Sequence, residues 1–408
     1  MPKTFGLPTQ TAYVGLCRRY LSFYLVLFLV GTETFLVSPL LPAITDDLHI
    51  SIDLSSTIVL AYVLVYAICA PFLGGVTDRF GRRTSVLIGG SIFLIGNILV
   101  ANSPGIILIV AGRAVAGLGA ALAGPAIWAH LADTSSPNER GQAMGAGMAA
   151  FSLGQIIGVP FGGVIADNIN WRVSFWMISL IALLAVCGTY RQTRNTPTTT
   201  GTSAFSVGVV FRLWGNPVLR HALVLTLVFH AANLGCYAFL GALMHYRFAL
   251  STQTLGLIGI VVGTGSFAGA LLGGKIVDKV RQKNGDAVCL PVWCLLLAVG
   301  ITGAAQAPFL VISLIGIVLW FLASGAFVTN QQTLLVNAAP AARATSSSWN
   351  TATMHIGTAL GVLVLTSFSD LRIGTLLFGG ITSLIAVAIA LALHARLLLL
   401  RSTTLRRL

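Results

Sequence analysis

The sequence consists largely of apolar stretches about 20 residues long, the length that crosses a bilayer as one helix. A polar or Gly/Pro-rich break bounds nearly every stretch. A helix satisfies its own backbone hydrogen bonds within lipid, and the sequence has no alternation typical of a membrane β-barrel. Hydrophobic residues make up 56% of the chain and charged residues 9%, against about 25% charged residues in an ordinary soluble protein. We therefore expect an all-α membrane protein.

Twelve membrane helices are expected, and their even number places both chain ends on one side of the bilayer. The apolar run nearest the N-terminus contains Glu33 and no small-residue cleavage site follows it, so we interpret it as a helix and not as a secretory signal. The six cysteines show no metal-binding spacing, and no metal site is expected. The predicted helices cover residues 21–43, 54–76, 84–102, 106–131, 141–166, 173–190, 220–244, 254–277, 287–306, 308–335, 344–368 and 373–395.

The positive charges gather on one side of this arrangement. Of the 24 Lys and Arg residues, 20 lie on the side of the chain ends and one, Arg113, lies within a helix; the other three are Arg172, Arg247 and Arg372. Cytoplasmic loops are enriched in Lys and Arg, so we predict that both termini are cytoplasmic. The net charge of +13 then records orientation in the membrane, and no nucleic-acid partner is expected.

The chain divides into two similar halves around a polar, Thr-rich, basic segment. We predict an N-terminal six-helix bundle at 1–190, a cytoplasmic linker at 191–219, a C-terminal six-helix bundle at 220–395 and a basic cytoplasmic tail at 396–408. Asp78-Arg79 after the second helix corresponds to Asp278-Lys279 after the eighth. Internal repeats of six helices are typical of secondary transporters, whose binding site lies between the repeats.

The loop after the second helix carries a longer motif. It reads Gly74-x-x-x-Asp78-Arg79-x-Gly81-Arg82-Arg83 and resembles the loop signature of the major facilitator superfamily. The resemblance covers the whole chain and implies the fold of that family, with two pseudo-symmetric halves of six membrane helices. It also implies that this loop is a conformational latch whose partner is a carboxylate at the end of the fourth helix, here Asp133. A basic loop that serves only membrane orientation is the alternative.

Two further motifs indicate a branch within the superfamily. Arg113-x-x-x-Gly117-x-Gly119 resembles the arginine-bearing motif of drug:proton antiporters. The segments Gly31-Thr-Glu33-Thr-Phe, Leu40-Leu-Pro42 and Asp47-Leu resemble the arabinose-efflux-permease-like branch. Small residues let helices pack closely, so tight packing is expected here even without a role in antiport. The fifth helix resembles the antiporter motif, although its proline falls one place after the usual Gly-Pro pair; its residues are Gly145, Gly154, Gly158, Pro160, Gly162 and Gly163.

Glu33 and Arg113 are the only charged residues in the middle of a predicted helix. An ionised carboxylate at membrane depth costs on the order of 3 kcal/mol, so residues of this kind are usually functional. Desolvation favours protonated Glu33, a nearby Arg113 favours the ionised form, and water or substrate changes that balance. We therefore predict that this pair couples transport to protons. A structural ion pair between the first and fourth helices is the alternative.

The second half offers uncharged polar and aromatic side chains in place of such a pair. They follow helical spacing on the seventh and tenth predicted helices, which in the superfamily line a central cavity together with the first and fourth. This set suits a neutral or amphiphilic solute better than a dianion, and interhelical hydrogen bonding is the alternative role. The candidate cavity residues, with one from the fourth helix, are Trp128, His230, Asn233, Tyr237, Ser324, Phe327 and Gln331.

The sequence as a whole predicts a monomeric inner-membrane antiporter that exports a small organic solute, such as a drug, sugar or metabolite, by alternating access. Its ligands are the solute and H+, and the proton motive force takes the place of a cofactor. An importer or facilitator of the same superfamily is one alternative. A membrane sensor without transport is another, and the longest loop, about 29 residues, is short for an output domain. The chain has no phosphate-binding Walker loop, HExxH or GxSxG motif, so no enzymatic activity is expected.

Overall fold

The computed structural model describes residues 10–136, 139–193, 211, 213–284, 287–339 and 343–405, and within these ranges every regular element is helical. Short turns of other geometry interrupt the α-helices: the π turns η1 (Gly154–Gly158) and η3 (Thr375–Gly379), and the 3-10 turn η2 (Leu213–Gly215). The α-helices are α1 (Gln10–Leu48), α2 (Ile52–Phe80), α3 (Arg82–Ala101), α4 (Ile106–Thr134), α5 (Arg140–Leu153), α6 (Val159–Asn168), α7 (Trp171–Thr193), α9 (Pro217–Ala238), α10 (Leu240–Phe248), α11 (Thr252–Asn284), α12 (Leu290–Gln306), α13 (Leu310–Ala338), α14 (Arg343–Leu365), α15 (Leu371–Gly374) and α16 (Gly380–Leu405).

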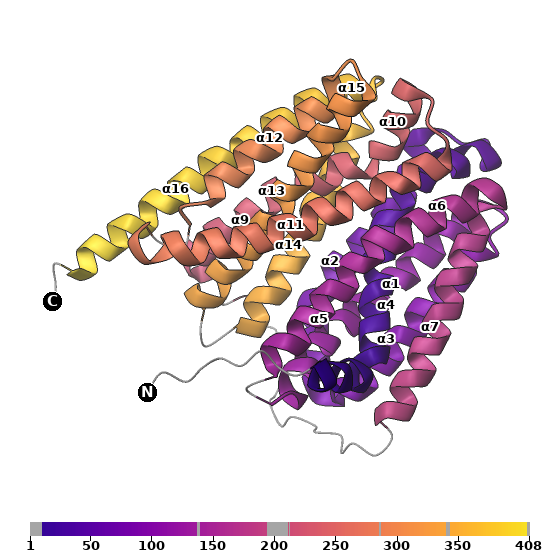
Figure 1. Cartoon of the computed structure of the whole chain (residues 1–408). Helices are drawn as coiled ribbons and strands as arrows, with labels where there is room; N and C mark the ends of the chain where they lie inside the picture. Colours follow the sequence, from indigo (N-terminus) through magenta and orange to yellow (C-terminus); the bar gives the residue numbers. More distant parts are fainter. Residues whose placement is uncertain are drawn as a thin grey trace.

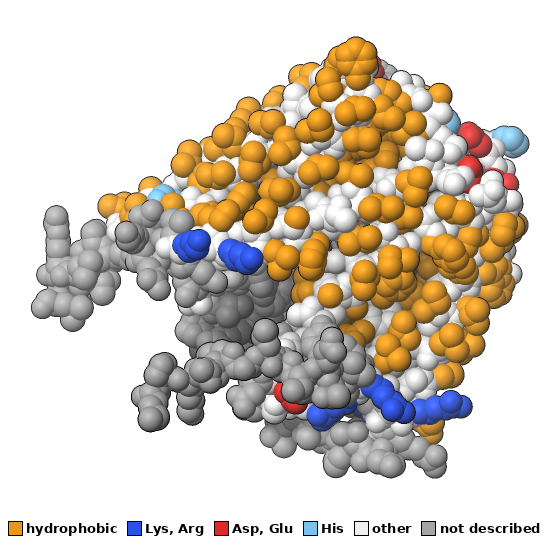
Figure 2. Space-filling model, viewed as in Figure 1, with side chains coloured by type: hydrophobic (Ala, Val, Ile, Leu, Met, Phe, Trp, Pro, Cys, Tyr) orange, Lys and Arg blue, Asp and Glu red, His pale blue; other side chains and the backbone are white. Residues whose placement is uncertain are grey.

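The length and the surface of these helices are those of a membrane protein. Ten helical runs in the described part of the chain are long and apolar enough to cross a bilayer, and α12 is a shorter apolar helix. Figure 2 shows hydrophobic side chains across the broad middle of one face, Lys and Arg side chains near its lower edge, and a group of Asp, Glu and His side chains at its upper right. The start of α1 and the end of α16 lie toward the same side (Figure 1). We call the end of the molecule with the start of α1 and the end of α16 the terminal face. The other end, where α10 and α15 lie, is the opposite face.

Three of the predicted helices are interrupted. The helix expected at 220–244 is two helices, α9 and α10, which meet at Phe239 without a proline. The helix expected at 141–166 contains η1, because Pro160 has no N–H to donate to the preceding turn and a wider turn accommodates it. The helix expected at 373–395 begins as α15 and η3, and α16 then continues to Leu405. Most of the segment predicted as a tail at 396–408 is therefore helical.

The helices pack in two groups that meet along a seam. α1 to α7 pack mainly among themselves, as α3 with α4 and α2 with α4, and α9 to α16 do the same, as α12 with α13 and α9 with α14. Figure 1 shows the indigo and magenta helices of the first group beside the orange and yellow helices of the second. The groups meet through α2 with α14, α6 with α11, and α1 with α10. The candidate site residues lie within these groups and along the seam.

Candidate functional site

Glu33 on α1 and Arg113 on α4 form a buried ion pair. Their residues are 0% and 2% exposed, and Nη1 of Arg113 donates to Oε1 of Glu33 at 2.5 Å. The two residues are 80 positions apart in the chain, and the fold of the first group brings them together. A buried charge without a partner costs several kcal/mol, so each of these charges depends on the other.

The ion pair has three further partners, none of which the sequence analysis identified. Nδ2 of Asn97 on α3 donates to Oε2 of Glu33 at 3.2 Å. Nε of Arg113 donates to the carbonyl oxygen of Ile58 on α2 at 3.3 Å, and its guanidinium lies 4.4 Å from the ring centre of Tyr62. A guanidinium over an aromatic face is stabilised by the ring quadrupole. Arg113 therefore keeps two favourable contacts that do not depend on the charge of Glu33.

The loop between α2 and α3 lies at the terminal face. Gly81 separates the two helices with φ of 83°, a conformation that favours glycine. Nε of Arg82 then donates to Oδ2 of Asp133 at 3.0 Å, and Arg83 lies 5.8 Å from the ring centre of Tyr190 on α7. The structure thus brings together Arg82 and the carboxylate expected as the latch partner. It does not describe the side chains at Gly74, Asp78 and Arg79.

The fifth predicted helix packs its glycines against α1. The hydroxyl of Thr32 donates to the carbonyl oxygen of Gly154 at 3.1 Å, across the two helices. A Cβ added at Gly158 would overlap that same hydroxyl, so only glycine allows this approach. The π turn between Gly154 and Pro160 places both glycines on this contact.

The other residues of this motif have different surroundings. A Cβ added at Gly162 would lie 2.6 Å from Leu36 of α1, and one added at Gly163 would lie 2.8 Å from Cα of Gly256 on α11. Gly163 therefore belongs to the seam between the two groups of helices. Gly145, in contrast, has no atom within 4 Å of an added Cβ. The motif is a close-packing surface over most of its length but not at its first glycine.

In the second group, Asn233 connects α9 to α13. Its Oδ1 accepts from Nε1 of Trp320 at 2.7 Å, and its Nδ2 donates to Oγ of Ser324 at 2.7 Å. Next to this amide, the ring of Phe327 stacks on Phe229 with centroids 3.6 Å apart, and His230 is buried beside them. The structure brings these predicted cavity residues together, and their hydrogen bonds join two helices.

A second polar network lies nearer the terminal face of the same group. Nε2 of Gln331 donates to Oγ1 of Thr226 at 3.0 Å, and Thr226 donates to Oδ1 of Asn350 at 2.7 Å. Nδ2 of Asn350 donates to Oε1 of Gln332 at 3.2 Å, and Gln332 donates to Oγ of Ser347 at 2.6 Å. This series of hydrogen bonds links α9, α13 and α14, and the side chains that form it are uncharged. Only Gln331 was a sequence candidate, because the spacing of residues does not reveal contacts with α14.

Two aromatic candidates occupy different places. Tyr237 on α9 reaches the seam, where its hydroxyl donates to the carbonyl oxygen of Phe35 at 2.7 Å. Trp128 instead packs inside the first group, since a Cβ added at Gly147 would lie 2.8 Å from its ring. At the seam, the rings of Tyr66 on α2 and His355 on α14 lie with centroids 4.2 Å apart. Neither His355 nor Tyr66 was a candidate from the sequence.

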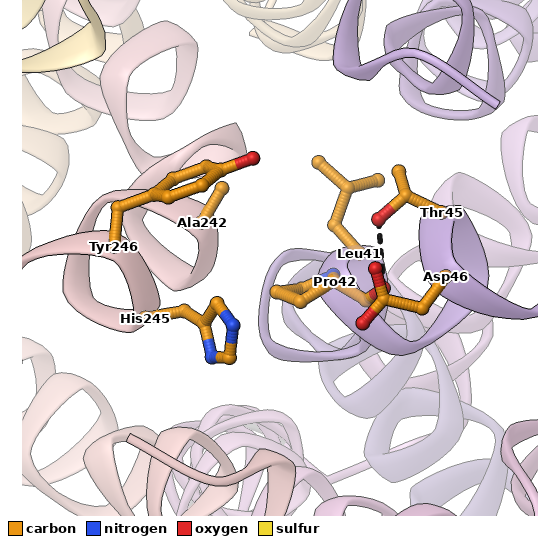
Figure 3. Close-up of a pocket in the computed structure, with 7 residues that line it drawn as sticks. All are labelled: Leu41, Pro42, Thr45, Asp46, Ala242, His245 and Tyr246. Carbon is orange, nitrogen blue, oxygen red and sulfur yellow. Dashed lines mark hydrogen bonds between the residues drawn. The ribbon is translucent and has the colours of Figure 1, made fainter. Parts of the chain in front are cut away.

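A small pocket of about 100 Å³ lies in the seam at the opposite face. Its wall from α1 includes Thr45 and Asp46, and its wall from α10 includes His245 and Tyr246. Figure 3 shows these two sets of side chains facing one another across the pocket. The two groups therefore face each other across a partly polar gap near this end of the molecule.

The family model described as Major Facilitator Superfamily matches residues 23–362. The uncharacterized MFS-type transporter YceJ of Bacillus subtilis (strain 168) is 30% identical over 374 residues, which are 91% of this chain and 93% of the relative. The chloramphenicol resistance protein of Streptomyces lividans is 25% identical over 383 residues, 90% of this chain and 93% of the relative. A bacterial homolog to the human lysosomal transporter Spinster, crystallised in an inward-facing and unoccupied conformation, has the same fold, with a TM-score of 0.72 at 16% identity over 95% of this chain and 96% of that one. The chain belongs to the Major Facilitator Superfamily of membrane transporters.

Proposed function

We propose that this transporter exports a small organic solute in exchange for protons, and that Glu33 carries the proton. The buried ion pair between Glu33 and Arg113 carries the proposal. Intramembrane ionisable residues are costly and therefore usually functional. An antiporter needs one group that cannot hold a proton while the solute is bound. A carboxylate paired with a cation in a transport pathway has that property.

The contacts of Arg113 support a specific sequence of events. When Glu33 takes up a proton its charge disappears, and Arg113 is then held by the Ile58 carbonyl and the Tyr62 ring. When the proton leaves, the ion pair forms again. A proton moving inward supplies about 2.3 kcal/mol per 100 mV of membrane potential, enough to concentrate a solute roughly tenfold or more. One proton per cycle is therefore sufficient for uphill export.

The second group of helices supports an uncharged, amphiphilic substrate. The described side chains of the two polar networks on α9, α13 and α14 are amides, hydroxyls, an indole and the imidazole of His230, and aromatic rings adjoin them. Such groups recognise hydrogen-bonding atoms and flat apolar surfaces, but they do not offset a substrate charge. The name of the Streptomyces lividans relative, a chloramphenicol resistance protein, agrees with export of an organic antimicrobial.

The distribution of charge supports an orientation with both termini in the cytoplasm of a bacterial cell, and hence location in the inner membrane. By sequence, 20 of the 24 Lys and Arg residues belong to the side of the chain ends, and Figure 2 shows Lys and Arg side chains near the terminal face. In this orientation the Arg82–Asp133 pair lies on the cytoplasmic side. We assign it the role of a latch that stabilises one conformation of the first group.

Transport by purified protein in liposomes tests the proposal. With an imposed pH gradient and a panel of uncharged aromatic solutes that includes chloramphenicol, the wild type should move at least one solute against its gradient. Glu33→Gln keeps a hydrogen-bonding side chain but binds no proton, so gradient-driven transport should fall to background. Exchange of solute for solute should persist, because it needs no proton.

The chain offers one matched control, since Glu139 is its only other glutamate. Glu139 accepts from Oγ of Ser136 at 2.8 Å on the surface, and Glu139→Gln should transport like the wild type. Undiminished gradient-driven transport by Glu33→Gln would refute the assignment of the proton site. Solute movement in the same direction as the protons would instead identify an importer.

A further inference from the structure

Two helices with interrupted backbone hydrogen bonding meet at the seam near the opposite face. α1 contains Pro39, which has no N–H, so the carbonyl oxygen of Phe35 four residues earlier lacks its helical donor. On the other side of the seam, α9 ends at Ala238 and α10 begins at Leu240. Each interruption leaves backbone groups that need partners in a buried environment.

The hydroxyl of Ser38 lies within the gap between α9 and α10. It donates to the carbonyl oxygen of Tyr237 at 2.7 Å and accepts from the N–H of Gly241 at 3.1 Å. An unbroken helix would join these two backbone groups directly, because they are four residues apart. The single hydroxyl of Ser38 therefore bridges a missing helical hydrogen bond in the other group of helices.

The interruption in α1 is completed from the other side in the same way. The hydroxyl of Tyr237 donates to the carbonyl oxygen of Phe35 at 2.7 Å, which is the acceptor that Pro39 leaves unpaired. Ser38 is 3% and Tyr237 6% exposed, so water does not replace these contacts in the described state. A Cβ added at Gly241 would overlap the carbonyl oxygen of Ser38, so this close approach requires glycine.

We propose that Ser38 is a positioning residue that holds the transporter closed at the opposite face by completing the broken helix α9–α10. When the seam opens, Gly241 and Tyr237 form their direct helical hydrogen bond, and water reaches the Phe35 carbonyl. Opening therefore exchanges hydrogen bonds and leaves no buried group unpaired, which makes the contact reversible. The inference rests on the proposed alternating access, because it assigns these contacts to one of its two states.

Accessibility of the seam tests this role independently of proton coupling. Ala242 lines the pocket of Figure 3 and is 2% exposed, so a cysteine there reports opening. In full-length protein with all six native cysteines replaced, Ala242→Cys is labelled in intact cells with a membrane-impermeant maleimide. Removing two hydrogen bonds with Ser38→Ala should raise the initial labelling rate about tenfold. Ser38→Thr, which keeps the hydroxyl, should stay within about twofold of the parent.

Ser179→Ala is the matched control, because Ser179 is equally buried at 3% and, among the residues that the structure describes, its hydroxyl bonds only within its own helix, to the Phe175 carbonyl at 2.8 Å. It should leave the labelling rate unchanged. If Ser38→Ala does not fold, Ser38→Val against Ser38→Thr compares two side chains of the same shape with and without the hydroxyl. Equal labelling of the hydroxyl-bearing and hydroxyl-free variants would overturn the role of Ser38. Faster labelling of Ser38→Ala in a protein that transports none of the solutes would support Ser38 and count against the proposed function.

Discussion

At the scale of single residues, the proposed proton site and the proposed seam contact both depend on buried side chains whose partners lie on other helices. Glu33 and Arg113 stand out because a bilayer makes mid-helix charges rare, and the fold pairs them. Asn97 and Ser38 do not stand out, since uncharged polar residues occur throughout these helices and their partners lie on other elements. Only the three-dimensional arrangement shows that one contacts the carboxylate and the other a broken helix.

Asn97 provides a test of how the surroundings of Glu33 set the proton dependence. Its amide donates to Glu33 at 3.2 Å, and this bond favours the ionised carboxylate. Asn97→Ala removes the donor, so Glu33 should hold its proton up to a higher pH. A hydrogen bond to a charged group contributes about 1.5–3 kcal/mol, which corresponds to a shift of the transport pH profile by about one to two units toward alkaline pH.

The matched control for this prediction is Asn102 at the end of α3, whose Nδ2 donates only to the Ile98 carbonyl at 2.8 Å. Transport rates measured from pH 5.5 to 8.5 should give the same profile for Asn102→Ala and for the wild type. A profile of Asn97→Ala that moves toward acidic pH would show that the amide does not favour the ionised carboxylate.

At the scale of elements, the positions of the helices were predictable and their interruptions were not. A bilayer requires each spanning segment to be apolar and helical, so composition alone locates the segments. The gap at Phe239 contains no proline, and its hydrogen bonds come from α1, about 200 residues away in the chain. The π turn at 154–158 precedes Pro160, but the proline alone predicts a bend and not the kind of turn.

The contact between α1 and the fifth predicted helix makes a prediction about packing. A Cβ at Gly158 would overlap the Thr32 hydroxyl, so Gly158→Ala should force the two helices apart. Overpacking of this kind costs about 1–3 kcal/mol, and we expect a melting temperature several degrees lower in detergent. Gly145→Ala is a control in the same motif, because its added methyl meets nothing within 4 Å. Equal melting temperatures for the two variants would contradict the packing argument.

At the scale of the whole molecule, the two ends of the protein are held in different ways. At the opposite face, hydrogen bonds from α1 to α9 and α10 cross the seam between the two groups. At the terminal face, the Arg82–Asp133 ion pair connects α3 and α4 within the first group. The seam contact can therefore bind one group directly to the other, whereas the ion pair acts by fixing the shape of one group.

The ion pair at the terminal face can be tested by exchanging its charges. The side chains of Arg82 and Asp133 are 27% and 57% exposed, and an ion pair this exposed contributes at most about 1 kcal/mol to stability. Arg82→Asp and Asp133→Arg should each fold and insert normally, yet a shift of about 1 kcal/mol between conformations should lower transport about fivefold. The double variant restores the attraction with its direction reversed, so transport should recover toward the wild-type rate. Asp133→Arg separates a latch from a charge that only directs insertion, because it breaks the ion pair but adds a positive charge on the side that is already rich in them, which leaves membrane orientation unchanged. Full transport by Asp133→Arg beside reduced transport by Arg82→Asp would leave membrane orientation as the role of Arg82.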